Sequence, residues 1–288
     1  MRYQEFQAAP LLAGIVECVW TLDGHAREMA DTQPVLPDGR PEIVLHRGDP
    51  FERVHADGRR ERQPSVIFAG QLLATLDLRA TGRIAVIGIR LHPHGAASLL
   101  RESQHRLVGQ TVALEVLSSP LKRALDDACA RGRGTHDTLQ ILQEALAARV
   151  DRRAIDRHVC AAVNHIHRAQ GLVSMDVLAA GVGVTTRHLE RQFKETVGIS
   201  PKRLGRITRF QRALRVFERL DSPQRGTLTA VECGYADQAH FVRDVVEFAG
   251  CAPGLHLLRR AELHGFFVSG PENRILSAAQ KLGPVDGE

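Results

Sequence analysis

The feature that most constrains the fold is a pattern of turn and helix residues that occurs twice near the C-terminus. In residues 173–201 it consists of a turn glycine, a helix cap and a closing G-x-x-P, supplied by Gly183, Thr185, Gly198 and Pro201. In residues 227–253 the same roles fall to Gly234, Asp237, Gly250 and Pro253. Glycine tolerates the positive φ of a tight turn, and Thr or Asp caps a following helix. The pattern therefore predicts two similar pairs of short helices, about 51 residues apart.

The second predicted helix of each pair has one apolar face. Leu189 and Phe193 are four residues apart in the first helix, so they share a side that packs inward. Phe241 and Val245 do the same in the second. The residues predicted on the outward faces are Thr186, Arg187, Glu190 and Arg191 in the first helix, and Gln238, Ala239, Val242 and Arg243 in the second.

A basic helix is predicted between the two pairs, over residues 202–220. Its apolar residues recur at spacings of three and four: Leu204, Ile207, Phe210, Leu214 and Phe217. Arginines occupy the other faces. Residues 187–225 hold eleven Lys and Arg against four Asp and Glu, whereas the whole chain carries a net charge of only +5. Such a concentration of cations is typical of a phosphate-binding surface, although a solvated helix face is the simpler alternative.

Two capped helix pairs in tandem, with a basic helix between them, predict two helix-turn-helix units. At about 1.5 Å per residue, the connecting helix is long enough to hold two reading helices roughly one DNA turn apart. Both could then enter successive major grooves on one side of a duplex. The sequence therefore favours a sequence-specific DNA-binding protein, with double-stranded DNA as its partner.

The C-terminal segment resembles the DNA-binding domain of AraC/XylS-type transcription regulators. The resemblance rests on LAAGVGVTTRHLERQFKETVGISPKRLGRITRFQRAL and on GYADQAHFVRD with FAGCAP. It implies seven helices, with one long helix joining two helix-turn-helix units. It also implies control of promoters together with RNA polymerase, and base reading by the eight outward-facing residues named above. Further candidates, for contacts with the DNA backbone, are Thr185, His188, Lys202, Arg203, Arg206 and His240.

The second unit departs from the family pattern at two positions. Thr229 stands where a large aliphatic residue is common, and Val245 stands where an aromatic is common. We therefore expect the second unit to be less stable than the first, or to contribute mainly phosphate contacts.

The N-terminal part is predicted to be rich in β-strands. VECVWTL, PEIVLHR, PSVIFAG and IAVIGIRL are short, contain many β-branched residues and are separated by turn residues. The predicted fold class is α+β, with a mainly β, barrel-like N-terminal domain and an all-α C-terminal domain. The expected boundaries are a sensor-like domain over 1–120, a helical connector over 121–153, the DNA-binding domain over 154–262 and a disordered tail over 263–288. The N-terminal pattern also resembles a poorly characterised domain of some such regulators, which names no ligand.

Three polar residues beside the turn-forming Pro37 and Gly39 are candidate contacts for a small-molecule effector: Asp38, Arg40 and Glu42. Turn capping and local ion pairing are the alternative roles. His46, His92 and His94 lie near strand ends, but a metal site needs three or four converging ligands. We expect no metal and no cofactor.

Other properties of the chain limit the classes of protein. The five cysteines are far apart and form no C-x-x-C pair, which favours reduced thiols. No long apolar run and no secretory signal is evident, so a cytoplasmic protein with no membrane partner is expected. A homodimer remains open. The alternatives to a regulator are an enzyme fused to a DNA-binding module, such as a metal-dependent barrel or an alkyl-transfer repair protein, and a helical protein-interaction module. We predict a regulator, not an enzyme.

Overall fold

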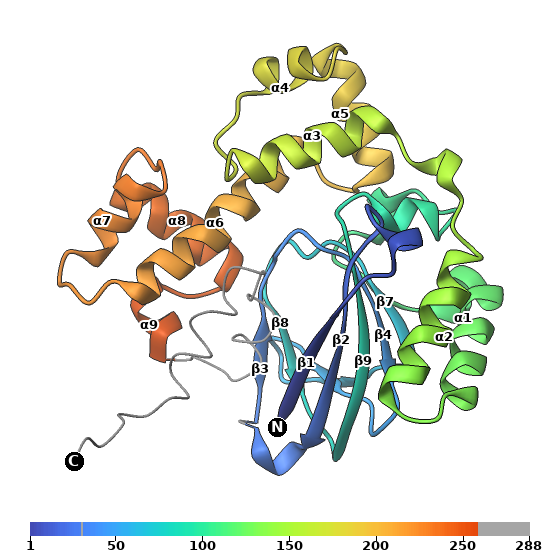
Figure 1. Ribbon diagram of the computed structural model, residues 1–288. Coiled ribbons are helices and arrows are strands. Elements are labelled where there is room, and N and C mark those ends of the chain that lie inside the picture. The colour runs from blue at the N-terminus through green and yellow to red at the C-terminus, as the bar shows by residue number, and fades with distance from the viewer. Residues whose placement is uncertain (30, 259–288) are drawn as a thin grey trace, which may run out of the picture.

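The computed structural model describes residues 1–29 and 31–258 and has an α+β architecture (Figure 1). Strands dominate the N-terminal part and helices the C-terminal part, which confirms the predicted fold class. The strands are β1 (Arg2–Gln7), β2 (Val16–His25), β3 (Gln33–Val35), β4 (Glu42–His46), β5 (Glu52–Val54), β6 (Arg60–Arg62), β7 (Val66–Ala69), β8 (Leu76–Arg79), β9 (Arg83–Leu91) and β10 (Thr111–Ala113). The tail predicted to be disordered, 263–288, lies outside the described residues.

The strands form two antiparallel sheets. The larger sheet has the order β1-β2-β9-β4-β7-β10, and the smaller has the order β3-β8-β5-β6. In the part of the chain that the structure describes, neither sheet closes on itself, so the barrel-like expectation is corrected to two open sheets. The four strands predicted from the sequence correspond to β2, β4, β7 and β9, which are neighbours in the middle of the larger sheet. Their backbone is paired on both sides, and their side chains supply much of the core.

Two helices cover one face of the larger sheet: α1 (Leu114–Arg131) and α2 (Thr135–Ala147) (Figure 1). Leu121 and Leu125 of α1, with Leu142 and Leu146 of α2, share a hydrophobic core with the strands. The segment expected to be a connector therefore packs on the β-sheet. A kink at Ser118 precedes Pro120, because proline cannot continue the hydrogen-bond pattern of a preceding turn.

Seven helices follow in the described residues, which agrees with the number that the family resemblance implies. They are α3 (Arg157–Arg168), α4 (Met175–Gly181), α5 (Thr186–Thr196), α6 (Pro201–Arg219), α7 (Arg225–Glu232), α8 (Gln238–Ala249) and α9 (Pro253–Leu258). In Figure 1, α4 and α5 lie toward one end of α6, whereas α7 and α8 lie beside its other part. The long helix thus joins two helix pairs, as predicted.

Among the described residues, no helix has both the length and the apolar composition needed to cross a membrane. All five cysteines are free thiols, and Cys18, Cys233 and Cys251 are buried. The thiols therefore act as small packing groups, as expected.

Candidate nucleic-acid interface

The turn and cap predicted for the first helix pair are present between α4 and α5. Gly183 has a φ of +74°, which suits a residue without a Cβ. The Thr185 hydroxyl accepts a hydrogen bond from the amide of His188 at 3.2 Å. This bond satisfies one of the amide groups that the start of a helix leaves without a partner. Thr185 therefore positions α5, and its contact with DNA remains a prediction.

Helix α5 buries one face and exposes the other. Leu189 and Phe193 are fully buried, as predicted. The predicted base-reading residues lie on the solvent side of the helix and are exposed or half-buried: Thr186, Arg187, Glu190 and Arg191. The guanidinium of Arg191 lies 3.5 Å from Nδ1 of His188. The exposed face of α5 therefore offers guanidinium, carboxylate and hydroxyl groups to a partner.

Helix α8 repeats this arrangement in the second pair. The Asp237 carboxylate accepts a bond from the His240 amide at 2.6 Å, and Gly234 precedes it with a φ of +69°. Phe241 and Val245 are fully buried. The predicted base-reading residues are exposed, apart from the half-buried Val242: Gln238, Ala239, Val242 and Arg243. The predicted base-reading faces of α5 and of α8 are thus both accessible to solvent.

One contact distinguishes the second face from the first. The Thr227 hydroxyl of α7 donates a hydrogen bond to Oε1 of Gln238 at 2.9 Å. The half-buried His240 ring lies edge-on to Tyr235, and its Nε2 is 3.3 Å from the Arg209 guanidinium of α6. Gln238 and His240 therefore already contact neighbours within the domain.

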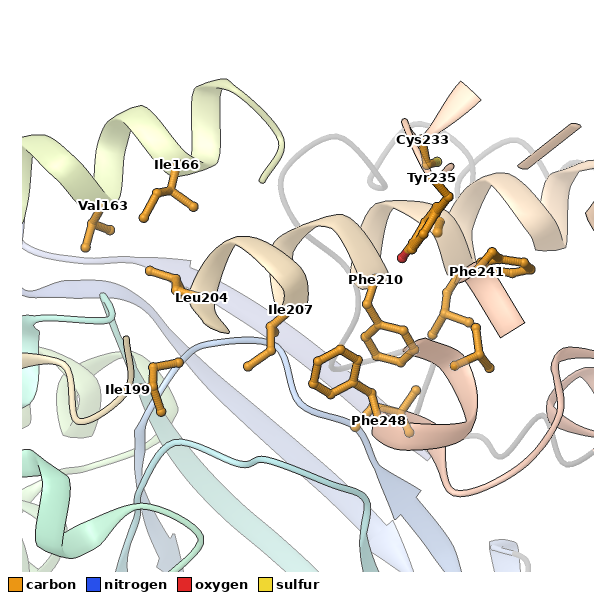
Figure 2. Close-up of a cluster of buried hydrophobic side chains, with 14 of the residues drawn as sticks. Val163, Ile166, Ile199, Leu204, Ile207, Phe210, Cys233, Tyr235, Phe241 and Phe248 are labelled. Atoms are coloured by element: carbon orange, nitrogen blue, oxygen red, sulfur yellow. The ribbon is translucent and has the colours of Figure 1, made fainter. Parts of the chain in front are cut away.

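Helix α6 forms the centre of the helical core (Figure 2). All five residues of the predicted apolar stripe are at most 5% exposed: Leu204, Ile207, Phe210, Leu214 and Phe217. Figure 2 shows Leu204 facing Val163 and Ile166 of α3, and Phe210 beside Phe248 of α8. The Phe210 and Phe248 ring centroids are 5.0 Å apart. Helix α6 therefore packs against both helix-turn-helix units.

The arginines at the start of α6 form ion pairs with two acids of α8. Arg206 bonds Asp244 at 2.6 Å and also pairs with Glu247. Arg203 pairs with Glu247, and Arg209 lies 3.2 Å from Asp244. Asp244 is 1% exposed, so its charge is compensated inside the domain. Arg203 and Arg206, predicted to contact phosphates, thus also brace α8 against α6, whereas Lys202 is exposed.

Sequence reasoning missed Asp244 and Glu247, although one signal was available. Asp244 occupies the inward stripe of α8, between Phe241 and Phe248 at helical spacing. An acid in an apolar stripe needs a buried cation, and the neighbouring helix is rich in arginine. That combination predicts an ion pair between the two helices.

A groove of about 610 Å³ separates the two units. Helices α6 and α8 line one side, and α4 with the preceding loop lines the other. Its charged and titratable lining residues are Lys202, Arg206, Arg209, His240, Arg243, Asp244 and Glu247. Cationic side chains outnumber the two acids, so the groove can hold an anion such as a phosphodiester.

A second cavity lies between the two sheets of the N-terminal part. All three candidate effector residues line it, which brings together Asp38, Arg40 and Glu42. Most of the remaining lining is apolar, from Trp20, Leu36 and other side chains of both sheets. The three residues predicted as a ligand contact therefore line one cavity.

The same residues also take part in capping and ion pairs, which were the alternative roles. The Asp38 carboxylate accepts a bond from the Arg40 amide at 2.9 Å, and Arg40 pairs with Glu17. The buried Arg90 donates to Glu42 at 2.8 Å. Burial raises the pKa of Asp38 to about 6, although Arg90 and Arg40 act in the opposite direction.

The three candidate histidines lie in two separate settings. His46 lines the cavity and bonds Gln63 at 3.1 Å, whereas His92 and His94 stack at 5.9 Å. Burial lowers the pKa of His46 and of His94 to about 4. In the described part of the chain, no three histidine, cysteine or acidic side chains converge as a metal-binding group would.

Two family models match the chain. Residues 4–113 match a domain of unknown function, DUF6597, and residues 178–258 match a helix-turn-helix domain. No curated protein matches the sequence. The second match begins within α4 and ends with α9, so it contains both candidate reading helices.

Several solved structures are similar to the chain. A transcriptional regulator of Chromobacterium violaceum, with an AraC-type DNA-binding domain, is 24% identical over 36% of this chain and 93% of its own, with a TM-score of 0.33. ToxT of Vibrio cholerae is 10% identical over 90% of this chain and 99% of its own, with a TM-score of 0.45. The AraC-like transcriptional activator CuxR is 14% identical over 81% of this chain and 98% of its own, with a TM-score of 0.28.

Proposed function

We propose that this chain, whose residues 178–258 match a helix-turn-helix domain, is a sequence-specific DNA-binding transcription regulator of the AraC type. The observation that carries the proposal is the pair of capped helices α5 and α8, each with an exposed outer face and a buried inner one. Both are held by the core around α6. Promoter DNA is then the partner, the site of action is the cytoplasm, and the activity is binding, not catalysis.

The chemistry of the two faces suits the edges of base pairs in the major groove. An arginine can donate two hydrogen bonds to O6 and N7 of guanine, so Arg187 and Arg191 are the strongest readers on α5. A glutamine can bond N6 and N7 of adenine, which is the role we propose for Gln238. Glu190 accepts from cytosine N4 or orients a neighbouring arginine.

Contacts with the DNA backbone fall to the cations around these faces and in the groove. Lys202 is exposed and lines the groove, and among the described residues it forms no side-chain ion pair. Arg203 and Arg206 both pair with Glu247. Each would bind a phosphate only after its ion pair with Glu247 is broken. We propose that these contacts set affinity at all sites alike, because phosphates carry no sequence information.

The domain assignments support further proposals about regulation. Residues 1–120 act as the sensor, with an effector in the cavity between the sheets, and residues 154–262 act as the DNA-binding domain. Action through RNA polymerase and the formation of a homodimer are part of the same proposal.

The test is selection of bound DNA from random duplexes with the full chain. We expect a motif with two half-elements about 10 base pairs apart, since each reading helix enters its own groove. Arg191→Ala should relax sequence preference in one half-element only. Arg123→Ala, on the exposed side of α1, is the matched control and should leave the motif unchanged. Selection of no motif by the wild-type protein would refute the proposal.

A further inference from the structure

The cavity between the sheets is too small for an ordinary effector as it stands. Its volume is about 80 Å³, whereas small-molecule sites usually measure roughly 300–1,000 Å³. An occupant must therefore displace part of the wall. The question is which part of the wall moves at the lowest cost, and what that part touches on its other side.

One part of the wall is a loop, the β3–β4 loop of residues 36–41. The strands that line the cavity are held by ladders of backbone hydrogen bonds, which include β3 with β8 and β4 with both β7 and β9. The loop between β3 and β4 lies outside those ladders. Leu36, Asp38 and Arg40 of this loop face the cavity. An occupant can therefore move the loop without opening a ladder, and it then breaks the bonds that the Gln71 side-chain amide and the Leu91 amide donate to the Gly39 and Pro41 carbonyls.

The other side of the β3–β4 loop lies against α6. The Gln211 side-chain amide donates a hydrogen bond to the Pro37 carbonyl at 2.5 Å, and both residues are buried. Gly39, at a φ of +80°, packs so closely that a Cβ there would lie 2.8 Å from Leu204 Cδ1. Leu36 belongs to the same hydrophobic cluster as the α6 stripe. The loop is thus shared between the cavity and the helix that joins the two units.

A second contact links the N-terminal part to the arginines of α6. The Arg203 guanidinium donates to the Leu73 carbonyl at 3.1 Å, while it pairs with Glu247. Thr75 donates to the Phe248 carbonyl at 3.0 Å. These contacts hold a predicted phosphate-binding arginine against the N-terminal part, so separation of the two parts would leave Arg203 with only its pair to Glu247 to exchange for a phosphate.

We propose that the β3–β4 loop couples the cavity to DNA binding: a small molecule with an apolar body and a cationic head enters, displaces the loop from α6 and raises DNA affinity. This inference rests on the proposed function for its last step only. It assigns an effector class and a coupling element to the same protein.

The cationic head follows from the charges at the polar end of the cavity. Asp38, Arg40 and Glu42 line the cavity there, and ion pairs join them to three charged residues outside the lining, Arg90, Glu17 and Glu5. The whole group holds four carboxylates and two guanidinium groups. The Arg90 guanidinium lies 4.0 Å from the Asp38 carboxylate, farther than from that of Glu42, at 2.8 Å. The apolar body follows from the surrounding Leu, Val, Ile, Phe and Trp side chains. An alkylammonium ion satisfies both requirements, because it offsets the excess negative charge and buries its chain.

Trp20 offers a direct readout of occupancy, because it is the single tryptophan of the chain and lines the cavity. The full chain is titrated with hexylammonium, hexanol and hexanoate while its fluorescence is followed. We expect a saturable change with hexylammonium at concentrations at least about tenfold lower than with the other two. Asp38→Asn should weaken the response by about tenfold, whereas Asp57→Asn, on an exposed turn, should not. Ala69→Leu fills the cavity and should abolish the response in a folded protein.

An absent response, or an equal response to hexanoate, would overturn the assigned ligand class. The coupling is measured separately by hydrogen exchange of residues 203–211, without DNA. Saturating hexylammonium should accelerate exchange in the wild type, and Gln211→Ala should show the faster exchange before any addition. Gln140→Ala, on the exposed side of α2, is the control. Unchanged exchange at full occupancy would refute the coupling.

The last step is measured with DNA selected by the protein. Hexylammonium should raise affinity at least about fivefold in the wild type, and much less in Gln211→Ala, where the loop is already released. Unchanged affinity at full occupancy would refute the regulatory role. Failure to bind DNA under any condition would instead refute the proposed function, while the fluorescence and exchange results would still decide the cavity and the loop.

Discussion

The two helix-turn-helix units share a backbone plan but are held in place by different forces. In the first, the Thr185 cap and the packing of Leu189 and Phe193 position α5, and its arginines face solvent. In the second, α8 is also tied to α6 by Asp244 and Glu247. Packing alone thus holds α5 against the core, whereas packing and ion pairs together hold α8. The ion pairs of the exposed Glu247 respond to salt and pH, so the position of α8 depends on both more than that of α5 does.

The second unit also contains a feature that the first lacks. Thr229 is 0% exposed, and its hydroxyl has no hydrogen-bond partner among the described residues. This agrees with its departure from the family pattern, in which a large aliphatic is common. A buried hydroxyl without a partner costs about 1–3 kcal/mol, which favours the expectation of a less stable second unit.

The largest effect is expected when Asp244 is removed. Asp244→Ala leaves Arg206 and Arg209 without their buried partner, so the free energy of unfolding should fall by about 3 kcal/mol. Urea unfolding measures this change. Asp126→Ala, in an exposed pair with Lys122 on α1, is the control and should cost at most about 1 kcal/mol. Equal losses in the two variants would show that α8 does not depend on its ion pairs.

Base discrimination should depend more on the first unit than on the second. Arg191→Ala should cost about 2 kcal/mol of preference between the selected site and a variant site, as expected for a bidentate arginine. Gln238→Ala should cost about 1 kcal/mol, since Thr227 already occupies its Oε1 and competes with a base. Competition binding with both sites measures the difference. A larger loss for Gln238→Ala would reverse the comparison.

The buried hydroxyl of the second unit provides a stabilising substitution. Thr229→Val keeps the shape and removes a polar group that has no partner, so it should stabilise the fold by about 1 kcal/mol. Thr138 is equally buried, but its hydroxyl donates to the Gly134 carbonyl at 2.7 Å. Thr138→Val should therefore destabilise by about 1 kcal/mol. Thermal unfolding of both variants gives the two signs, and the same sign in both would contradict the argument.

The smallest expected effect is a loss of local stability in α8 at acidic pH. Hydrogen bonds from Arg206 lower the pKa of Glu247 below its usual value. A carboxyl whose pKa is lower in the folded state contributes stability above its unfolded pKa and loses it as pH falls through the folded one. Below about pH 4.5, exchange of α8 amides should therefore rise before that of α5 amides. In Glu247→Gln this difference should shrink, and an unchanged difference would point to another acid.

Regular elements with a buried face could be predicted from the sequence. Strands β2, β4, β7 and β9 are neighbours in the larger sheet, and their β-branched residues between turn residues showed where they lie. The edge strand β6 is Arg-Glu-Arg and fully exposed, so no apolar pattern marks it. The smaller sheet was therefore not predicted from the sequence. For the same reason, the arrangement of the strands in two open sheets was not predicted.

The sequence by itself determined the helix pairs, their caps, their turn glycines and the exposed faces of α5 and α8, because these depend on residues within a few turns of one another. Only the tertiary structure decided that the arginines of α6 meet Asp244 and Glu247, and that the β3–β4 loop rests on Gln211. Those contacts join residues that are far apart in the chain. Periodicity gives the side of a helix on which a residue lies, but only packing in three dimensions selects the partner that it meets.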